Sequence, residues 1–101
     1  MNNDRYKVAV SSDLGELIPG YMKNQRKDLE ALRAALAAAD FEKLRQLGHR
    51  MKGTGDSYGF SKVTILGNQI ENSARSGDRA GLEALIGDYA EYLANVQVVY
   101  K

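Results

Sequence analysis

Apolar residues recur along most of this chain in alternating steps of three and four, and this spacing limits what the chain can fold into. A stripe with this spacing runs along one side of an α-helix, which has to bury it against another element. Four stretches carry such a stripe, and Gln25 is the polar exception in the first. The first stripe consists of Ile18, Met22, Leu29, Leu32 and Leu36, and the second of Phe41, Leu44, Leu47, Gly48, Met51, Gly55 and Tyr58. The third consists of Val63, Leu66, Ile70 and Ala74, and the fourth of Leu82, Leu85, Ile86, Tyr89, Leu93 and Val96. The pattern predicts four amphipathic helices around one core.

Capping and breaking residues separate the four stretches. Pro19 suits the first turn of a helix, which places the first helix at about 19–38. Asp40, Ser61 and Asp78 are good N-caps for the other three. Gly59 and the pair Ser76-Gly77 are expected to end the second and third helices. Because short connections favour antiparallel neighbours, we predict an all-α fold, an antiparallel up-down-up-down four-helix bundle.

The two ends of the chain are less regular. Ser12 or Asp13 is predicted to cap a short extra N-terminal helix that runs to Ile18. Residues 7–10 are apolar and are expected to be extended or tucked against the body. Residues 96–100 are rich in valine, but their position after a long helix argues against a strand.

Length and composition exclude several classes of function. The chain has 101 residues, which predicts one domain over 1–101. A net charge of +1 argues against non-specific nucleic-acid binding, and the absence of cysteine excludes thiol chemistry. No apolar run approaches the roughly 20 residues of a membrane span, and the polar N-terminus does not resemble a signal peptide. We therefore expect a cytoplasmic protein with no membrane contact.

His49 is the only histidine, and it follows the buried stripe of the second predicted helix by one residue. One residue is a rotation of about 100°, so the imidazole is expected at the accessible flank of the core. Lys52 and Gly53 follow at three and four residues, on the same helix face. A glycine inside a helix costs roughly 1 kcal/mol relative to alanine, and close approach by another molecule is one reason to keep it. An imidazole beside a cation and a gap suggests a phosphoryl-carrying site.

Glu71 occupies the equivalent flank of the third predicted helix. If the two helices pack side by side, its carboxylate can accept Nδ1–H of His49 and leave Nε2 as the nucleophile. Gly67, one turn earlier, would let the two backbones approach closely. Pairing of Glu71 with Arg75 at i+4 is the alternative. One histidine, no cysteine and no clustered carboxylates predict no metal site, and no glycine-rich loop for nucleotide follows a strand.

Residues 48–71 resemble the signature of the histidine-containing phosphotransfer (HPt) domain. That signature is His-x-(Leu/Met)-Lys-Gly, then small residues, a second glycine, and an apolar helix ending in Leu/Ile followed by Glu or Gln. This chain reads His49-Arg50-Met51-Lys52-Gly53, Thr54-Gly55, Tyr58-Gly59-Phe60 and Leu66-Gly67-Asn68-Gln69-Ile70-Glu71. Met51 stands where leucine is commoner, and Thr54-Gly55 where Ser-Ala is commoner. The helix pattern of residues 13–97 is similar to the family's bundle.

The resemblance implies a phosphocarrier of two-component signalling. His49 would accept a phosphoryl group from the aspartate of a response-regulator receiver domain and pass it to another, and Lys52 would offset charge on the phosphoryl oxygens. Partners would be receiver domains, a hybrid histidine kinase, or both. Mg²⁺ would belong to the receiver, so that the chain needs no cofactor, and a monomer is expected. The residues expected to dock a partner are Arg45, Arg50, Gly53, Asp56, Thr64, Gly67 and Asn68.

Two other functions stay open from the sequence. The chain could be the phosphoacceptor domain of a chemotaxis-type histidine kinase, phosphorylated directly by an ATP-binding domain. It could also be a non-catalytic helical adaptor, in which His49 has no chemical role. In the phosphate-carrying versions the chain is a relay intermediate without kinase activity of its own.

Overall fold

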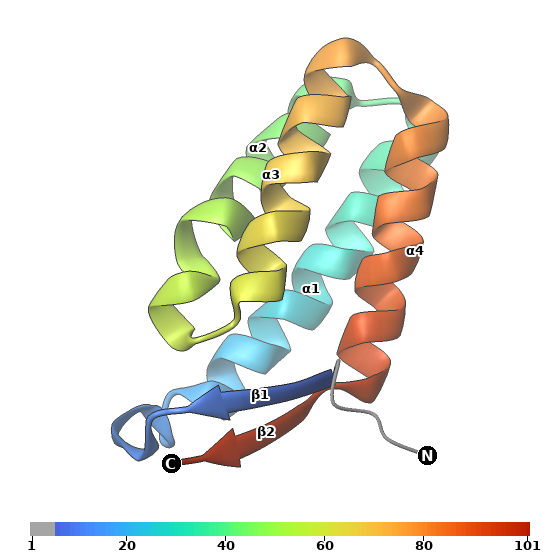
Figure 1. Ribbon diagram of the computed structural model, residues 1–101. Coiled ribbons are helices and arrows are strands. Elements are labelled where there is room, and N and C mark those ends of the chain that lie inside the picture. Colours follow the sequence, from blue (N-terminus) through green and yellow to red (C-terminus); the bar gives the residue numbers. More distant parts are fainter. Residues whose placement is uncertain (1–5) are drawn as a thin grey trace.

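Four helices make up most of the computed structural model, which describes residues 6–101 (Figure 1). They are α1 (Ile18–Ala37), α2 (Phe41–Thr54), α3 (Ser61–Ser76) and α4 (Arg79–Asn95). In Figure 1 the chain ascends along α1, returns along α2, ascends along α3 and descends along α4. The predicted helical bundle is therefore present. Most of the N-terminal segment judged unlike a signal peptide, residues 1–5, lies outside the described residues.

The helix boundaries follow the local capping chemistry with two exceptions. The carboxylates of Asp40 and Asp78 accept the backbone N–H groups of residues 43 and 81, at 3.1 and 2.9 Å. Gly77 adopts a left-handed φ of 69° after α3, a conformation that glycine adopts without strain.

The prediction that Gly59 ends the second helix is wrong, because α2 ends at Thr54 and the chain tightens into a 3₁₀ turn, Asp56–Tyr58, whose Tyr58 N donates to the Gly55 carbonyl. Gly59, with a φ of 88°, ends this turn. The prediction that Ser61 caps α3 is wrong. Phe60 is the N-cap, without a side-chain cap, because its burial in the core fixes the point where the helix begins.

The core lies where the four stripes meet, and it contains more tyrosine than the stripes indicated. Tyr21, Tyr89 and Tyr92 are all buried, and Tyr21 stacks on Tyr58 with the ring centroids 4.4 Å apart. Gln25, the polar exception, is 3% exposed and accepts a hydrogen bond from the Tyr89 hydroxyl. A buried amide oxygen needs such a donor, so the polar position in α1 is matched by a polar position in α4.

Two short strands close the end of the bundle, contrary to the prediction for the C-terminal tail. β1 (Lys7–Val10) and β2 (Gln97–Tyr100) pair in parallel, with Lys7 opposite Gln97 and Val10 opposite Tyr100 (Figure 1). Lys101 continues the pairing, since its carbonyl accepts from Ser12 N at 3.1 Å. A parallel pair needs a long crossover, and here the whole bundle supplies it. The valine-rich tail becomes a strand because a partner from the other end of the chain lies beside it.

The prediction of a short extra N-terminal helix is also wrong. Residues Ser12–Leu14 form a three-residue 3₁₀ turn, and α1 does not begin until Ile18. Ser11 caps this turn by accepting from Asp13 N at 3.3 Å. Because Ser12 N is already bonded to the end of β2, the segment is tied to the sheet and makes only the turn from β1 to α1.

None of the helices described in residues 6–101 combines the length and the apolar character required to cross a membrane.

Candidate functional site

Two buried glycines bring α2 and α3 unusually close together. A Cβ on Gly48 would lie 2.7 Å from Glu71 N and 2.8 Å from the carbonyl oxygen of Gly67. A Cβ on Gly67 would lie 2.5 Å from Lys52 N. No larger side chain fits at such distances without pushing the helices apart. The helix faces that flank these glycines carry His49, Lys52 and Glu71, and the close approach brings both His49 and Lys52 into contact with Glu71.

His49 and Glu71 meet across this interface. The distance from His49 Nδ1 to Glu71 Oε2 is 2.9 Å. An ionised carboxylate can only accept, so Nδ1 carries a hydrogen, and in the neutral form of the ring Nε2 is then the nitrogen with the free lone pair. The His49 side chain is 65% exposed, whereas that of Glu71 is 1% exposed. The imidazole is therefore held from its buried side while the ring stays open to a second molecule.

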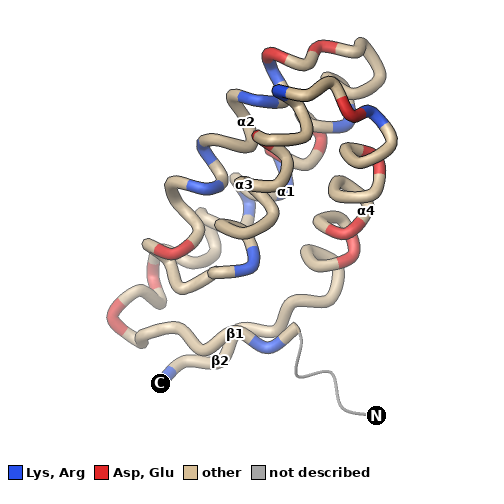
Figure 2. Tube along the Cα trace, turned by 45° about the horizontal axis from the view of Figure 1, so that its top comes forward, with Lys and Arg blue, Asp and Glu red and all other residues tan. Residues whose placement is uncertain are grey.

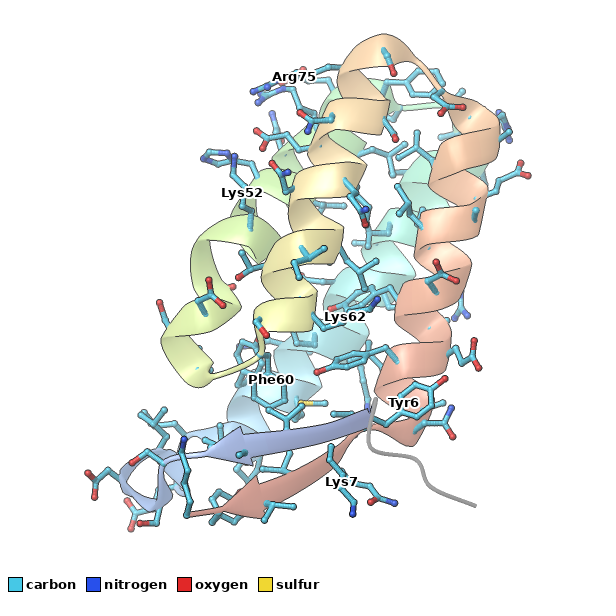
Figure 3. All side chains as sticks on the ribbon, viewed as in Figure 1. Tyr6, Lys7, Lys52, Phe60, Lys62 and Arg75 are labelled. Atoms are coloured by element: carbon cyan, nitrogen blue, oxygen red, sulfur yellow. The ribbon has the colours of Figure 1, made fainter. Side chains whose placement is uncertain are left out.

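The Glu71 carboxylate has two further cationic partners. Lys52 Nζ lies 2.7 Å from Oε1, and a guanidinium nitrogen of Arg75 lies 3.1 Å from Oε2. Figure 3 shows Lys52 and Arg75 on the same side of the molecule. The hydrogen bond from Lys52 lowers the pKa of Glu71 below its ordinary value of 4.5 against the raising effect of burial, and His49 and Arg75 lower this pKa further. Glu71 is thus a carboxylate at neutral pH, and both sequence-derived pairings, with His49 and with Arg75, occur together.

The two arginines expected to dock a partner are engaged within the chain. Arg45 forms an ion pair with Glu42 one turn earlier in α2, and Arg50 forms one with Asp28 of α1. Both pairs are partly exposed, so they contribute little to stability and can rearrange. Arg45 precedes His49 by about one turn of α2, and Arg50 follows it directly in the chain.

Gly53 and Asn68 lie at the surface, Gly53 one turn after His49 on α2 and Asn68 one turn before Glu71 on α3. A Cβ added to Gly53 would meet nothing within 4 Å, so no neighbour in the fold explains this glycine. The Asn68 side chain is exposed on α3. These two positions leave open surface on the α2 and α3 sides of His49.

The other three expected docking residues serve the local structure. Gly67 is buried in the helix interface. Thr64 is half-buried, and its hydroxyl accepts from Asp56 N at 2.8 Å and donates to the carbonyl of Lys52 at 3.3 Å. Asp56 is exposed at the turn after α2. Thr64 thereby fixes the end of the helix that carries His49.

Sequence reasoning did not identify the role of Gly48 and Gly55 in this packing. A Cβ on Gly55 would lie 2.5 Å from Thr64 N, which repeats the close contact of Gly48 with α3. The available signal was the occurrence of two glycines on a helix stripe that otherwise carries large apolar residues. Small residues on such a stripe mark a position where another backbone approaches.

Charge is unevenly distributed although the net charge is only +1. Figure 2 shows lysine and arginine spread along α2, and aspartate and glutamate along α4. His49 therefore lies on the cationic side of the bundle. Its ring is open to solvent, with the side chain 65% exposed, and it does not line the groove of about 540 Å³ between α1 and α2, to which Arg50 and Thr54 contribute. Within residues 6–101, no group of three His, Cys, Asp or Glu side chains is placed to hold a metal ion.

Comparison with protein families identifies a match that covers most of the chain. The model of the Hpt domain matches residues 16–98, a span that includes all four helices and the whole His49, Lys52, Glu71 and Arg75 cluster. Comparison with curated proteins and with solved structures gave no significant match.

Proposed function

Because this chain belongs to the Hpt domain family, whose domains act in phosphotransfer of two-component signalling, we propose that it carries a phosphoryl group on His49 Nε2. The observation that supports this assignment most strongly is the His49–Glu71 contact. An Nδ1–H donated to this carboxylate would leave Nε2 of the neutral ring as the nucleophile, on a side chain that is 65% exposed. A buried histidine could be oriented in the same way but could not reach a substrate attached to another protein.

The transfer needs only a lone pair from this chain. Nε2 attacks the phosphorus of an aspartyl phosphate, the N–P bond forms, and the P–O bond breaks with its electron pair going to the aspartate carboxylate. The imidazole becomes positively charged while its Nδ1–H stays bonded to Glu71. The carboxylate stabilises this cation because it is ionised and already in place. The reverse attack by a second aspartate returns the lone pair to Nε2 and moves the phosphoryl group onward.

Lys52 offsets the charge of the phosphoryl group in this proposal. Lys52 lies on α2, three residues after His49, and its Nζ atom contacts Glu71 Oε1. The Lys52 side chain is 37% exposed. A phosphoryl group brings about 1.5–2 negative charges at neutral pH. A lysine ammonium on a flexible stem can exchange Glu71 for a phosphoryl oxygen without moving the helix.

The proposed partners are receiver domains of response regulators, alone or within a hybrid histidine kinase. The receiver would supply Mg²⁺ and the acidic pocket, so this chain would need no cofactor of its own. It would act as a monomer in the cytoplasm. Two features support docking around His49: the open surface at Gly53 and the cationic side of the bundle along α2. A cationic surface steers an acidic partner and fixes its orientation more than it increases affinity. Arg45 and Arg50 would exchange their internal partners for acidic groups of the receiver, and Asn68 would contact it from α3.

The test follows a radiolabelled phosphoryl group from a phosphorylated receiver domain onto this chain. The parent protein is expected to acquire acid-labile label, and His49→Gln is expected to acquire none. Arg79→Gln, an exposed position on α4 remote from His49 in sequence, serves as the control and should be labelled like the parent. If His49→Gln accepts label as fast as the parent, the proposal is wrong and the adaptor function becomes the better explanation.

A further inference from the structure

The Glu71 carboxylate has more cationic partners than its single charge requires. Glu71 is 1% exposed, and Lys52 on Oε1 already pairs it. Arg75 adds a second full positive charge on Oε2, the same oxygen that accepts from His49. One buried carboxylate needs one cation to offset its charge, so the second cation calls for a separate reason.

The two cations differ in the helix to which they belong. Lys52 is on α2, three residues from His49, and Arg75 is on α3, one turn after Glu71. The ion pair between Arg75 and Glu71 therefore lies within α3, and a movement of the Lys52 side chain on α2 does not break it. Lys52, in contrast, can leave Glu71 for a negative group that arrives on His49.

Before the N–P bond forms the imidazole is neutral, so a departure of Lys52 toward the incoming phosphoryl group would leave Glu71 buried without a cation if Arg75 were absent. Breaking a buried ion pair by removing one partner is strongly unfavourable because the remaining charge is uncompensated. Arg75 prevents this, since its guanidinium stays on Oε2 and keeps the carboxylate ionised and oriented toward His49 Nδ1. In a neutral imidazole the hydrogen can otherwise occupy either ring nitrogen, and only one choice leaves Nε2 nucleophilic.

We propose that Arg75 is a positioning residue for phosphoryl transfer: through Glu71 it holds the Nδ1–H tautomer of His49 and frees Lys52 to serve the phosphoryl group. This inference rests on the proposed function of His49. Arg75 does not touch the reacting atoms, and its effect passes through the carboxylate. Because a single guanidinium nitrogen of Arg75 contacts Glu71, the ammonium group of a lysine at this position can make the same contact.

The experiment compares the parent with Arg75→Gln, Arg75→Lys and a matched control. Arg79→Gln removes an Arg–Glu pair of the same i,i+4 type, with Glu83 on α4 and no histidine beside it. His49 is the only histidine, so the ¹⁵N signals of imidazole nitrogens in a labelled sample belong to it alone. These signals give the share of each tautomer, and label transfer from a phosphorylated receiver gives the rate.

Arg75→Gln is expected to increase the share of the Nε2–H tautomer and to slow phosphoryl acceptance about threefold to tenfold, since Arg75 is 57% exposed and solvent screens part of its effect. Arg75→Lys should recover most of the rate, and Arg79→Gln should match the parent in both measurements. Thermal unfolding checks that all variants fold.

Two failures are distinguishable. If Arg75→Gln keeps the tautomer and the rate of the parent while His49 still accepts label, the role of Arg75 is overturned and the proposed function stands. The same holds if Arg75→Lys is as slow as Arg75→Gln, because the argument rests on charge. If the parent takes no label, or His49→Gln takes as much, the proposed function itself fails, whatever the tautomer measurement shows.

Discussion

At the scale of single residues, Glu71 holds the site together. It is the one carboxylate that His49, Lys52 and Arg75 share, and it lies beneath them at 1% exposure. Sequence position alone placed it at the flank of α3 with two alternative partners, because helix periodicity gives a direction and not a distance. The structure shows that the alternatives do not compete, since a carboxylate has enough acceptor positions for all three donors.

Glu71 should make the free energy of unfolding depend on pH in the acidic range. Its pKa is lower in the folded chain than its ordinary value of 4.5, chiefly through Lys52. Its contribution is therefore present above that value and is lost as the pH falls through the lower, folded pKa. We expect Glu71→Gln to be less stable than the parent at about pH 7, and the difference in unfolding free energy to shrink steadily below about pH 4. Urea unfolding over a pH series measures it, and a difference that stays constant down to about pH 2 would contradict the assignment.

At the scale of elements, α2 carries two glycines with opposite surroundings. Gly48 faces α3 so closely that a Cβ would come within 2.7 Å of Glu71 N, whereas a Cβ on Gly53 would meet nothing. The sequence placed Gly48 on the core stripe and Gly53 beside His49, which was the right geometry. It could not show that Gly48 sets the distance between α2 and α3, because that distance depends on the residue opposite.

Alanine substitutions at these two glycines should shift stability in opposite directions. Gly48→Ala is expected to lower the free energy of unfolding by about 1–3 kcal/mol, because overpacking pushes α2 away from α3. Gly53→Ala is expected to raise it by about 0.5–1 kcal/mol, because alanine favours the helix and meets no neighbour. Chemical denaturation monitored by circular dichroism measures both.

The same Gly53→Ala protein tests the idea that this glycine leaves room for a partner. If it does, label transfer from a phosphorylated receiver should slow although the protein is more stable. A variant that is more stable and accepts label as fast as the parent would assign Gly53 no part in docking.

At the scale of the whole molecule, tyrosines and a polar pair tie α1 to α4. Tyr89 donates to Gln25 across the core, while the hydroxyl of Tyr92 has no hydrogen-bond partner among the described residues. Burial raises the pKa of Tyr92 to about 12, and it raises the pKa values of Tyr21 and Tyr89 above the ordinary 10.0 as well. The folded chain therefore keeps these hydroxyls neutral at a pH where the unfolded chain ionises them.

Stability should consequently fall in alkali. A raised folded pKa gives stability that is present below the unfolded value of about 10 and is lost as the pH rises through the folded value. Tyr92→Phe should change the unfolding free energy by less than roughly 0.5 kcal/mol near neutral pH, because no hydrogen bond is lost, and should flatten the alkaline decline. Tyr89→Phe should cost about 1–3 kcal/mol at neutral pH, because it leaves the buried oxygen of Gln25 without its donor. Equal losses for the two variants at neutral pH would contradict this difference.

The sequence by itself determined the helices, most of their ends and the face of α2 on which His49 lies. These features depend on residues a few positions apart: the three-and-four spacing, the Asp40 and Asp78 caps, the stop at Gly77, and His49 with Lys52 and Gly53 on one face. Local spacing fixes them because one helical turn spans only about four residues.

Only the tertiary structure decided what pairs with what across the chain. The strand at Gln97–Tyr100 exists because Lys7–Val10 lies beside it, and the three-residue turn after β1 follows from that pairing. In the site, Glu71 gains all its contacts through the close approach of α2 and α3 and through Arg75 on its own helix. Such contacts depend on the distance between packed backbones, which no local pattern of residues encodes.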